Sequence, residues 1–314
     1  MRNSMRTPGA KSSDASARRR RQMPNNQFVL IGVLYTMTFS LRRASTAAYG
    51  WVRATLFATA LIAAPLPAQS APTPVPARAP ARATIDHSAF DRLLRAHVSD
   101  GLVDYDAFRD ATAFRGYLAS LERASLAGAD DDEQLAFWIN VYNAYTIQLI
   151  VSHGERESIR NVNRTLGVLR LKGPWSEPIV RAAGRTLTLD DVQHRIIRKD
   201  FHDPRIHFAL VAAAKSSPPL RSEAYTGARL DAQLFDQGRR FLTDTSTNKI
   251  ATQYPRLSPI FTYYKSDFGN SRSDLGGYLA TWFDGETKKK LESGRFGMRE
   301  MPFDWSLNAK LPTR

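Results

Sequence analysis

The most constraining feature of this sequence is a long stretch that is apolar on every side of a helix. Residues 135–151 read LAFWINVYNAYTIQLIV, with Asp130 to Asp132 shortly before them and Gly154 shortly after. Acidic residues favour the first turn of a helix, which carries positive partial charge, and glycine favours its end. A helix that is apolar all round is buried in a core. The sequence therefore predicts a domain built around a buried helix from about 130 to 152.

Two amides interrupt this helix, Asn140 and Asn143, and their spacing of three places them on one face. A buried amide without a hydrogen-bond partner costs about 1–3 kcal/mol, so both must be paired. Two interpretations follow. The amides tie down loops that cross the helix, or they orient a catalytic or ligand group in a binding site.

The rest of the domain is expected to be mainly helical with few strands. Apolar spacing, caps and glycines predict helices near 88–98, 106–122, 189–198, 228–243 and 275–283, and short strands at 206–212 and 249–252. The predicted fold class is therefore α+β, a helix-rich single domain with a small β-sheet. No internal repeat is visible.

The segments that flank the domain differ from it in composition. Residues 1–40 form a basic extension, of which residues 1–36 would be an artefact if translation starts at Met37. Residues 41–70 resemble a signal peptide, with basic residues, the short apolar run 54–64 and small residues before a cleavage point. An uncleaved membrane anchor is the alternative. A Pro/Ala linker follows at 71–84, then the globular domain at 85–286 and a basic tail at 287–314.

Charge and cysteine content exclude several classes of function. The net charge is +14, but residues 1–70 hold ten of the 44 Lys and Arg and only one acidic residue, so the remainder carries +5. That is not the footprint of a nucleic-acid-binding domain, and no nucleic-acid partner is expected. The chain has no cysteine, which excludes disulfides, thiol nucleophiles and thiolate metal sites. Without a Gly-rich phosphate loop or His spacing typical of metal sites, neither a cofactor nor a metal is expected.

A candidate site lies where an apolar run ends in polar residues. The run 208–214 is followed by Lys215, Ser216, Ser217 and two prolines, and Tyr225 comes shortly after. Serine can act as a nucleophile when a histidine or a lysine of lowered pKa takes its proton. The candidate bases are His194, His207 and Lys215, with Ser216 as the nucleophile. A polar cleft that binds a ligand, lined by Asn140, Asn143, Ser217 and Tyr225 beside them, remains the alternative.

Four stretches in order resemble the domain of unknown function 547 family, over residues of about 86–284. They read QLAFWINVYNAYTIQLIV, LTLDDVQHRIIR, DPRIHFALVAAAKSSPPLRSEAYTGARLDAQL and LSPIFTYYKSDFG. Bacterial members, often exported, typically have cysteines where this chain has Ala212 and Ser217. The resemblance suggests a distant likeness to papain-like and transglutaminase-like folds, although their cysteine chemistry would be lost here.

These observations lead to two hypotheses about function. In the first, the chain is an exported envelope protein, periplasmic or secreted, whose polar cleft around the end of the 206–217 segment binds an unknown ligand or envelope partner. In this interpretation the protein meets the membrane only through its signal segment. In the second, it is a hydrolase or transferase that uses His with Lys and Ser at the same place.

Overall fold

In the computed structural model of the chain, the described residues are 84–162, 173–252 and 254–310. The chain divides into two compact units, Met1–Ser70 and Ala71–Arg314, and every described residue lies in the second. The predicted basic extension, the signal peptide and nearly all of the linker therefore lie outside the described residues.

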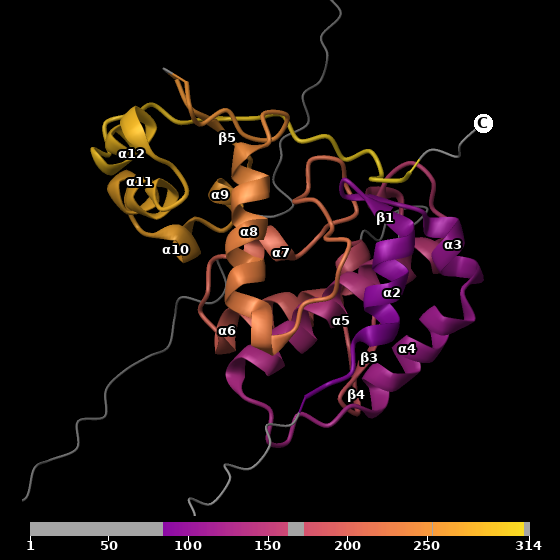
Figure 1. The fold of residues 1–314 in the computed structure, drawn as a ribbon. Helices are drawn as coiled ribbons and strands as arrows, with labels where there is room; N and C mark the ends of the chain where they lie inside the picture. Colours follow the sequence, from indigo (N-terminus) through magenta and orange to yellow (C-terminus); the bar gives the residue numbers. More distant parts are fainter. Residues whose placement is uncertain (1–83, 163–172, 253, 311–314) are drawn as a thin grey trace, which may run out of the picture. The chain divides into compact units, whose positions relative to one another are not determined.

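Helices make up most of the regular structure (Figure 1). The α-helices are α2 (Ser88–His97), α3 (Tyr105–Asp110), α4 (Thr112–Arg123), α5 (Asp131–His153), α6 (Arg198–Asp200), α7 (Ile206–Ala209), α8 (Leu230–Thr243), α9 (Ile260–Tyr263), α10 (Lys265–Phe268), α11 (Arg272–Ala280) and α12 (Gly285–Glu292). A π-helix spans Asp191–Ile197, and single 3-10 turns span Ile159–Asn161, Pro174–Ser176 and Gly227–Arg229.

The strands are short and form separate pairs. β1 (Val98–Ser99) pairs with β2 (Leu102–Val103), and β3 (Val180–Ala182) with β4 (Arg185–Leu187), both antiparallel; β5 (Arg256–Leu257) and β6 (Arg299–Glu300) pair in parallel. The predicted helix-rich α+β class is confirmed, with two-stranded sheets in place of one small sheet. Among the helices of the described residues, none combines the length and the hydropathy that crossing a membrane requires.

Helix α5 is the buried helix that the sequence predicts. The Asp130 carboxylate caps it by accepting a hydrogen bond of 2.9 Å from the Glu133 N–H, and Gly154 ends it at a φ of 59°. Nearly every side chain from Leu135 to Ile150 is buried. Helices α3 and α4, the π-helix and the Gly227–Arg229 turn all pack against it, so the other elements are arranged around this helix.

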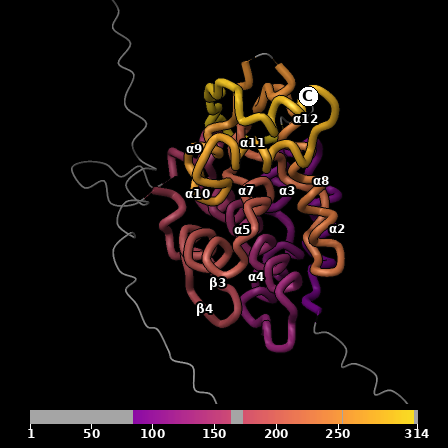
Figure 2. Tube along the Cα trace, turned by 90° about the vertical axis from the view of Figure 1, so that its left-hand side faces the viewer, coloured from indigo at the N-terminus to yellow at the C-terminus, as the bar shows by residue number. Residues whose placement is uncertain are grey.

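Each of the two amides of α5 binds the backbone of a crossing segment through one donated and one accepted hydrogen bond, as paired strands bind each other. Asn143 donates from Nδ2 to the Ala209 carbonyl at 2.9 Å and accepts from the Val211 N–H at 3.0 Å. Asn140 makes the same pair of bonds with the carbonyl and N–H of Tyr225, at 2.8 and 3.0 Å. The interpretation that they tie down loops is thus the observed one, and Figure 2 shows α7 lying next to α5.

Two apolar clusters form the core, and α7 lies between them. The larger cluster surrounds α5, and the smaller one gathers side chains from α8 to α12. Ile206 and Ala209 of α7 belong to the larger cluster and Phe208 to the smaller one. Figure 1 shows the same arrangement, with α9 to α12 at one side, α2 to α5 at the other, and α7 and α8 between them.

Two predicted strands are absent from the described residues. Residues 206–212 begin as α7 and continue as irregular chain from Leu210, and 249–252 contribute only an isolated bridge at Lys249. A short apolar run cannot be assigned to a strand or a buried helix by periodicity alone. Here the run lies between two apolar clusters, and a helical turn buries its side chains in both.

The C-terminal segment differs from the predicted peripheral tail. Leu307 and Asn308 are buried, and the Asn308 carbonyl accepts a hydrogen bond from the Val103 N–H at 2.9 Å. The Asn308 side chain accepts a hydrogen bond from the Tyr105 hydroxyl at 2.6 Å. Residues 303–309 alternate apolar and polar side chains, and Asn308, Ala309 and Lys310 pair with Val103 of β2.

A histidine is buried in the larger cluster without being paired to a charge. His87 is 3% exposed, and its Nδ1 lies 2.8 Å from the Tyr117 hydroxyl, while Nε2 is buried without a partner. Burial lowers the pKa of His87 to about 4. The folded protein therefore holds this imidazole neutral at neutral pH.

Replacing Asn143 by Leu should lower the free energy of unfolding by about 3 kcal/mol, because the Ala209 carbonyl and the Val211 N–H would be buried without partners. Thr146→Val is the matched control on the same helix. The Thr146 hydroxyl donates to the Tyr142 carbonyl within the helix, and its loss should cost less than about 1 kcal/mol. Urea unfolding measures both values, and equal losses would contradict the pairing role of Asn143.

The free energy of unfolding should fall as the pH is lowered from 6.5 to about 4. Over this range the unfolded chain binds a proton at His87 and the folded chain does not. The stabilisation that comes from the lowered pKa of His87 is therefore fully present above pH 6.5 and is lost as the pH falls towards 4. The contribution of His87 is about 3 kcal/mol. Urea midpoints measured across this range should depend less steeply on pH in His87→Gln, and an unchanged slope would refute the assignment.

Candidate functional site

Lys215 and Ser216, near the end of the 206–217 segment, form hydrogen bonds with the C-terminal segment. Lys215 is exposed, and its N–H donates to the Ser306 carbonyl at 2.9 Å. The Ser216 hydroxyl oxygen accepts from the Asp304 N–H at 2.9 Å. Within the described residues no imidazole hydrogen-bonds to Ser216. A serine nucleophile needs a base within hydrogen-bond reach, so the catalytic use of Ser216 stays a prediction.

Ser217 holds a strained turn. Its buried oxygen accepts hydrogen bonds from the N–H groups of Ala212 and Ala214, at 3.2 and 3.3 Å. Between them Ala213 has a φ of 50°, a conformation that residues other than glycine rarely adopt. The hydroxyl therefore stabilises the backbone of this turn.

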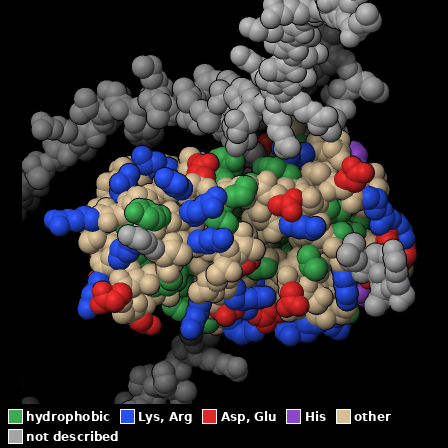
Figure 3. Space-filling view, turned by 90° about the horizontal axis from the view of Figure 1, so that it is seen from above, with side chains coloured by type: hydrophobic (Ala, Val, Ile, Leu, Met, Phe, Trp, Pro, Cys, Tyr) green, Lys and Arg blue, Asp and Glu red, His purple; other side chains and the backbone are tan. Residues whose placement is uncertain are grey.

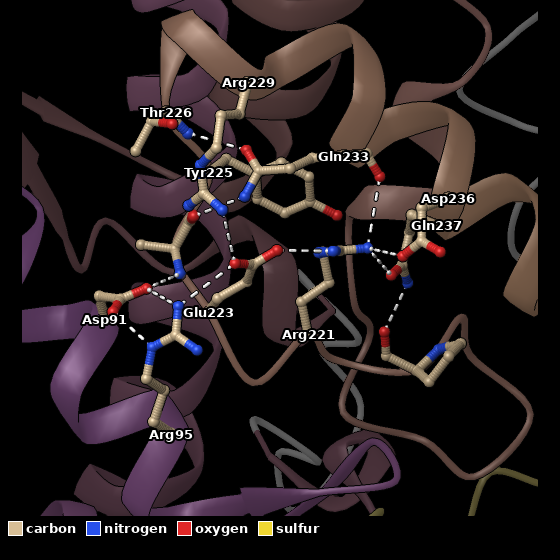
Figure 4. Close-up of polar contacts among 12 residues, drawn as sticks. Asp91, Arg95, Arg221, Glu223, Tyr225, Thr226, Arg229, Gln233, Asp236 and Gln237 are labelled. Atoms are coloured by element: carbon tan, nitrogen blue, oxygen red, sulfur yellow. Dashed lines mark hydrogen bonds and ion pairs between the residues drawn. The ribbon is translucent and has the colours of Figure 1, made fainter.

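Tyr225 belongs to a network that anchors the loop before α8 (Figure 4). Its backbone pairs with Asn140, and its ring is buried with the hydroxyl unpartnered. Below it the Glu223 carboxylate accepts hydrogen bonds from Arg221, Arg229 and Arg95, at 2.6, 2.9 and 3.3 Å. Burial tends to raise the pKa of Glu223, but the hydrogen bonds, that of Arg221 first, outweigh it and lower the pKa to about 2.

This network joins the loop to α2 through Arg95 and to α8 through Asp236. The same loop approaches α5 closely at Gly227, whose N–H donates to Glu133 at 3.0 Å. A Cβ at Gly227 would lie 2.8 Å from the Glu133 backbone, so only glycine fits there. The predicted binding residues Asn140, Asn143, Ser217 and Tyr225 thus make bonds that shape the fold.

The two predicted histidines lead to a different cluster, centred on His207. This residue lies in α7 between the two apolar clusters, and its side chain is fully buried. Its Nε2 lies 2.7 Å from the Asp267 carboxylate of α10, and its ring stacks on Tyr264 with 4.0 Å between the centroids. An apolar environment that contains one carboxylate fixes the direction of the imidazole.

Arg198 binds the same carboxylate through two parallel hydrogen bonds. Its Nε and Nη2 donate to the two oxygens of Asp267, at 2.6 and 2.7 Å. Burial by itself raises the pKa of Asp267, but hydrogen bonds from His207 and Arg198 outweigh it and hold the pKa well below its usual range. Asp267 is therefore ionised at neutral pH.

His194 lies on the other side of Arg198. The Arg198 Nη1 and the His194 Nδ1 are 3.0 Å apart, and because arginine can only donate, Nδ1 is the acceptor. The neutral imidazole then carries its proton on Nε2. Burial first, and the Arg198 charge second, lower the pKa of His194 to about 4, so it is neutral at neutral pH.

The backbone that presents His194 is a π-helix. Thr188 and Asp191 cap its start reciprocally, with Thr188 N–H donating to Asp191 at 3.0 Å and Asp191 N–H to the Thr188 hydroxyl at 3.0 Å. Thr or Ser followed three residues later by an acidic residue is a sequence signal for the start of a helix. Gln193 donates to the Tyr264 hydroxyl at 2.9 Å. Segments of π-helix are rare and are frequent at functional sites.

A second carboxylate lies beyond His194. Asp190 has one oxygen 4.0 Å from the His194 Nε2, and its other oxygen accepts from the Ser176 hydroxyl at 2.9 Å. Burial raises the pKa of Asp190. The two carboxylates of the cluster are therefore shifted in opposite directions, which is a feature of many functional sites.

The His207 imidazole has one nitrogen in use and one free. Because Nε2 donates to the ionised Asp267, the neutral ring has its lone pair on Nδ1, which is buried without a hydrogen-bond partner. Burial lowers the pKa of His207 despite the carboxylate. The ring is thus a neutral, oriented base whose free nitrogen faces the protein interior.

A cleft of about 240 Å³ opens beside this cluster. Its lining residues are Arg198, His202, Asp203, Pro204, Ile206, Ser266 and Asp267. His202 is exposed and has a φ of 51°, so its backbone is strained at the rim. The cleft borders the first residue of the 206–217 segment, whereas the sequence interpretation placed it at the other end.

Several residues of the cluster were not among the predicted candidates. They are Asp190, Gln193, Arg198, His202, Tyr264, Ser266 and Asp267. Asp267 and Tyr264 stand in the quoted stretch LSPIFTYYKSDFG, where a lone carboxylate and tyrosines in an apolar context were the available signal. In the part of the chain that the structure describes, no group of three or more acidic or His side chains is placed to hold a metal ion.

The fold and the cluster define a helix-rich α+β protein with an Arg, Asp and His cluster beside a small cleft. The model of the family described as Protein of unknown function, DUF547, matches residues 126–242. The resemblance that the sequence suggests is confirmed over this range, which is shorter than the predicted 86–284. Asp267 and Tyr264 lie outside the match.

No curated protein and no solved structure matches the chain. The distant likeness to papain-like and transglutaminase-like folds therefore stays a prediction.

Replacing Arg198 by Gln should raise the pKa of His194 from about 4 by about one pH unit, because a neighbouring cation is removed and the ring becomes more accessible. Arg195→Gln is the control, since Arg195 is exposed and pairs with Asp191. Titration of the ring protons by NMR measures both. If both variants shift the pKa of His194 equally, Arg198 does not control it.

Proposed function

We propose that this protein is an exported binding protein whose cleft beside Asp267 takes a small zwitterionic ligand, such as an amino acid or the end of a short peptide. The observation that carries the proposal is the lining of the cleft. It places a guanidinium, two carboxylates, an imidazole and a hydroxyl around about 240 Å³. Groups of both signs in one small cleft complement a ligand that carries an amine and a carboxylate.

The cluster behind the cleft supports this proposal by holding the charged groups in one geometry. Arg198 and Asp267 are joined by two hydrogen bonds, and Asp267 is also held by His207. The Arg198 guanidinium lies 5.2 Å from the centre of the Tyr264 ring, which limits its movement. Preorganised charges lose little freedom when a ligand binds, and this favours affinity.

Export is part of the proposal and depends on residues 41–70. The basic residues, the short apolar run and Ala68 and Ser70 before a cleavage point support a cleaved signal. N-terminal sequencing of the protein recovered from a periplasmic or culture fraction would then begin at Ala71. A chain that remains whole in the cell would contradict this part of the proposal.

Acid–base catalysis is a second candidate, favoured by the free Nδ1 of His207. A carboxylate that orients an imidazole, with a lone pair on the opposite nitrogen, is the base-and-orienter pair of many hydrolases. The pair would need a movement of the interior to expose Nδ1. The Lys215 and Ser216 version of the catalytic hypothesis has no such support, because the Ser216 hydroxyl accepts from the Asp304 N–H and the Lys215 N–H donates to Ser306.

Binding of alanylalanine, measured by calorimetry, should weaken about tenfold in His202→Asn and in Ser266→Ala, because each removes a polar group from the cleft. Both residues are exposed, and asparagine tolerates the positive φ of His202, so the variants should stay folded.

Lys215→Ala and Ser216→Ala are the controls and should bind as the parent does. Loss of binding in the controls with retention in His202→Asn would move the site to the other end of the segment. Hydrolysis of the dipeptide that disappears in His207→Gln would favour the catalytic candidate instead.

A further inference from the structure

Three cations lie side by side across the small β5–β6 region. Lys249 and Arg256 exchange backbone hydrogen bonds of 2.7 and 3.1 Å, and Arg256 is the partner of Arg299 in the parallel β5–β6 pair. Residues that pair in this way have side chains on the same face, about 5 Å apart. Lys249, Arg256 and Arg299 therefore form one basic row, and all three are exposed.

The opposite face of this region is part of the core. Ile250 and Leu257, the next residues in sequence, are 3% and 1% exposed and belong to the smaller apolar cluster. Because alternate residues of extended chain point to opposite faces, the burial of Ile250 and Leu257 directs Lys249 and Arg256 outward. The row is thus fixed by the core beneath it.

None of these three side chains forms an ion pair among the described residues. Glu300, which follows Arg299 in the sequence, is exposed and, like the rest of the described chain, forms no ion pair with the row. Like charges directly opposite each other destabilise strand pairs. A row of cations without acidic partners therefore opposes the fold locally, which a structural role alone does not explain.

A further cation and an exposed aromatic ring lie at the loop between Lys249 and Arg256. Lys290 of α12 donates to the Thr252 carbonyl at 2.5 Å, which brings α12 to the loop after Lys249. Tyr254, in the same loop, is 66% exposed. Figure 3 shows Lys and Arg side chains interspersed with hydrophobic ones on the face seen from above, on the side of α12.

We propose that this basic patch, made of Lys249, Arg256, Arg299 and Tyr254, docks the protein on an anionic phospholipid surface. Exposed tyrosine beside lysine and arginine suits the headgroup region, where an amphipathic ring sits at the interface and cations meet lipid phosphates. An oligonucleotide would use the same cations and could stack on the tyrosine ring, so it is the competing outcome of the test. The proposal adds a membrane contact to the one expected of the signal segment, and it does not depend on the ligand cleft.

The test uses the full chain and vesicles of phosphatidylglycerol mixed with phosphatidylcholine. Hydrogen exchange should slow at residues 249–257 and 298–301 when these vesicles are added, and not with phosphatidylcholine alone. This readout separates the patch from residues 1–70, whose charges can also attract a membrane. Binding that occurs without slower exchange in these segments would overturn the proposal.

Charge reversal at Lys249, Arg256 and Arg299 together should remove the protection and weaken the patch-dependent binding at least about tenfold. The control reverses Arg92, Arg123 and Lys199, three exposed cations in α2, α4 and α6, and changes the net charge equally. Tyr254→Ala, which leaves the charge unchanged, should reduce the protection.

Equal effects of the two charge reversals would overturn the proposal, as would protection of the patch by an oligonucleotide but not by vesicles. Circular dichroism confirms that each variant is folded.

Discussion

The arrangement of this protein depends on how the polar groups inside α5 are satisfied. A helix that is buried on every side leaves no route for water, so each amide within it must find its partner in the protein. Asn140 and Asn143 find theirs in the backbone of Tyr225 and of the chain after α7. These bonds determine where two loops cross the helix, and thereby where α7 lies.

The position of α7 in turn creates the candidate site. Its apolar residues divide between two clusters, which leaves His207 at the boundary, fully buried and directed at Asp267. The charge of Asp267 is balanced by Arg198, and burial first, with the Arg198 charge second, lowers the pKa of His194 and keeps it neutral. A half-buried carboxylate is stabilised by such partners, so the polar cluster contributes to the fold as well as being a candidate for function.

Sequence reasoning located the main elements but only part of the polar cluster. The buried helix followed from its apolar sequence, and its burial required that both amides be paired, with crossing loops as one of two interpretations. His194 and His207 were recognised as candidates, yet their partners were sought at Ser216. Adjacency along the chain suggested that partner, while Asp267 lies sixty residues after His207 and meets it only through the packing of α10 on α7.

The sequence by itself determined the buried α5, the helix-rich class and the absence of thiol chemistry, because these follow from local periodicity and composition. Only the tertiary structure decided that residues 206–209 are helical, that the C-terminal segment packs beside β2, and that Arg198, His207 and Asp267 meet. The physical reason is that these three features depend on which apolar and polar groups of distant segments are buried against each other. Local periodicity and composition carry no information about such contacts between segments far apart in sequence.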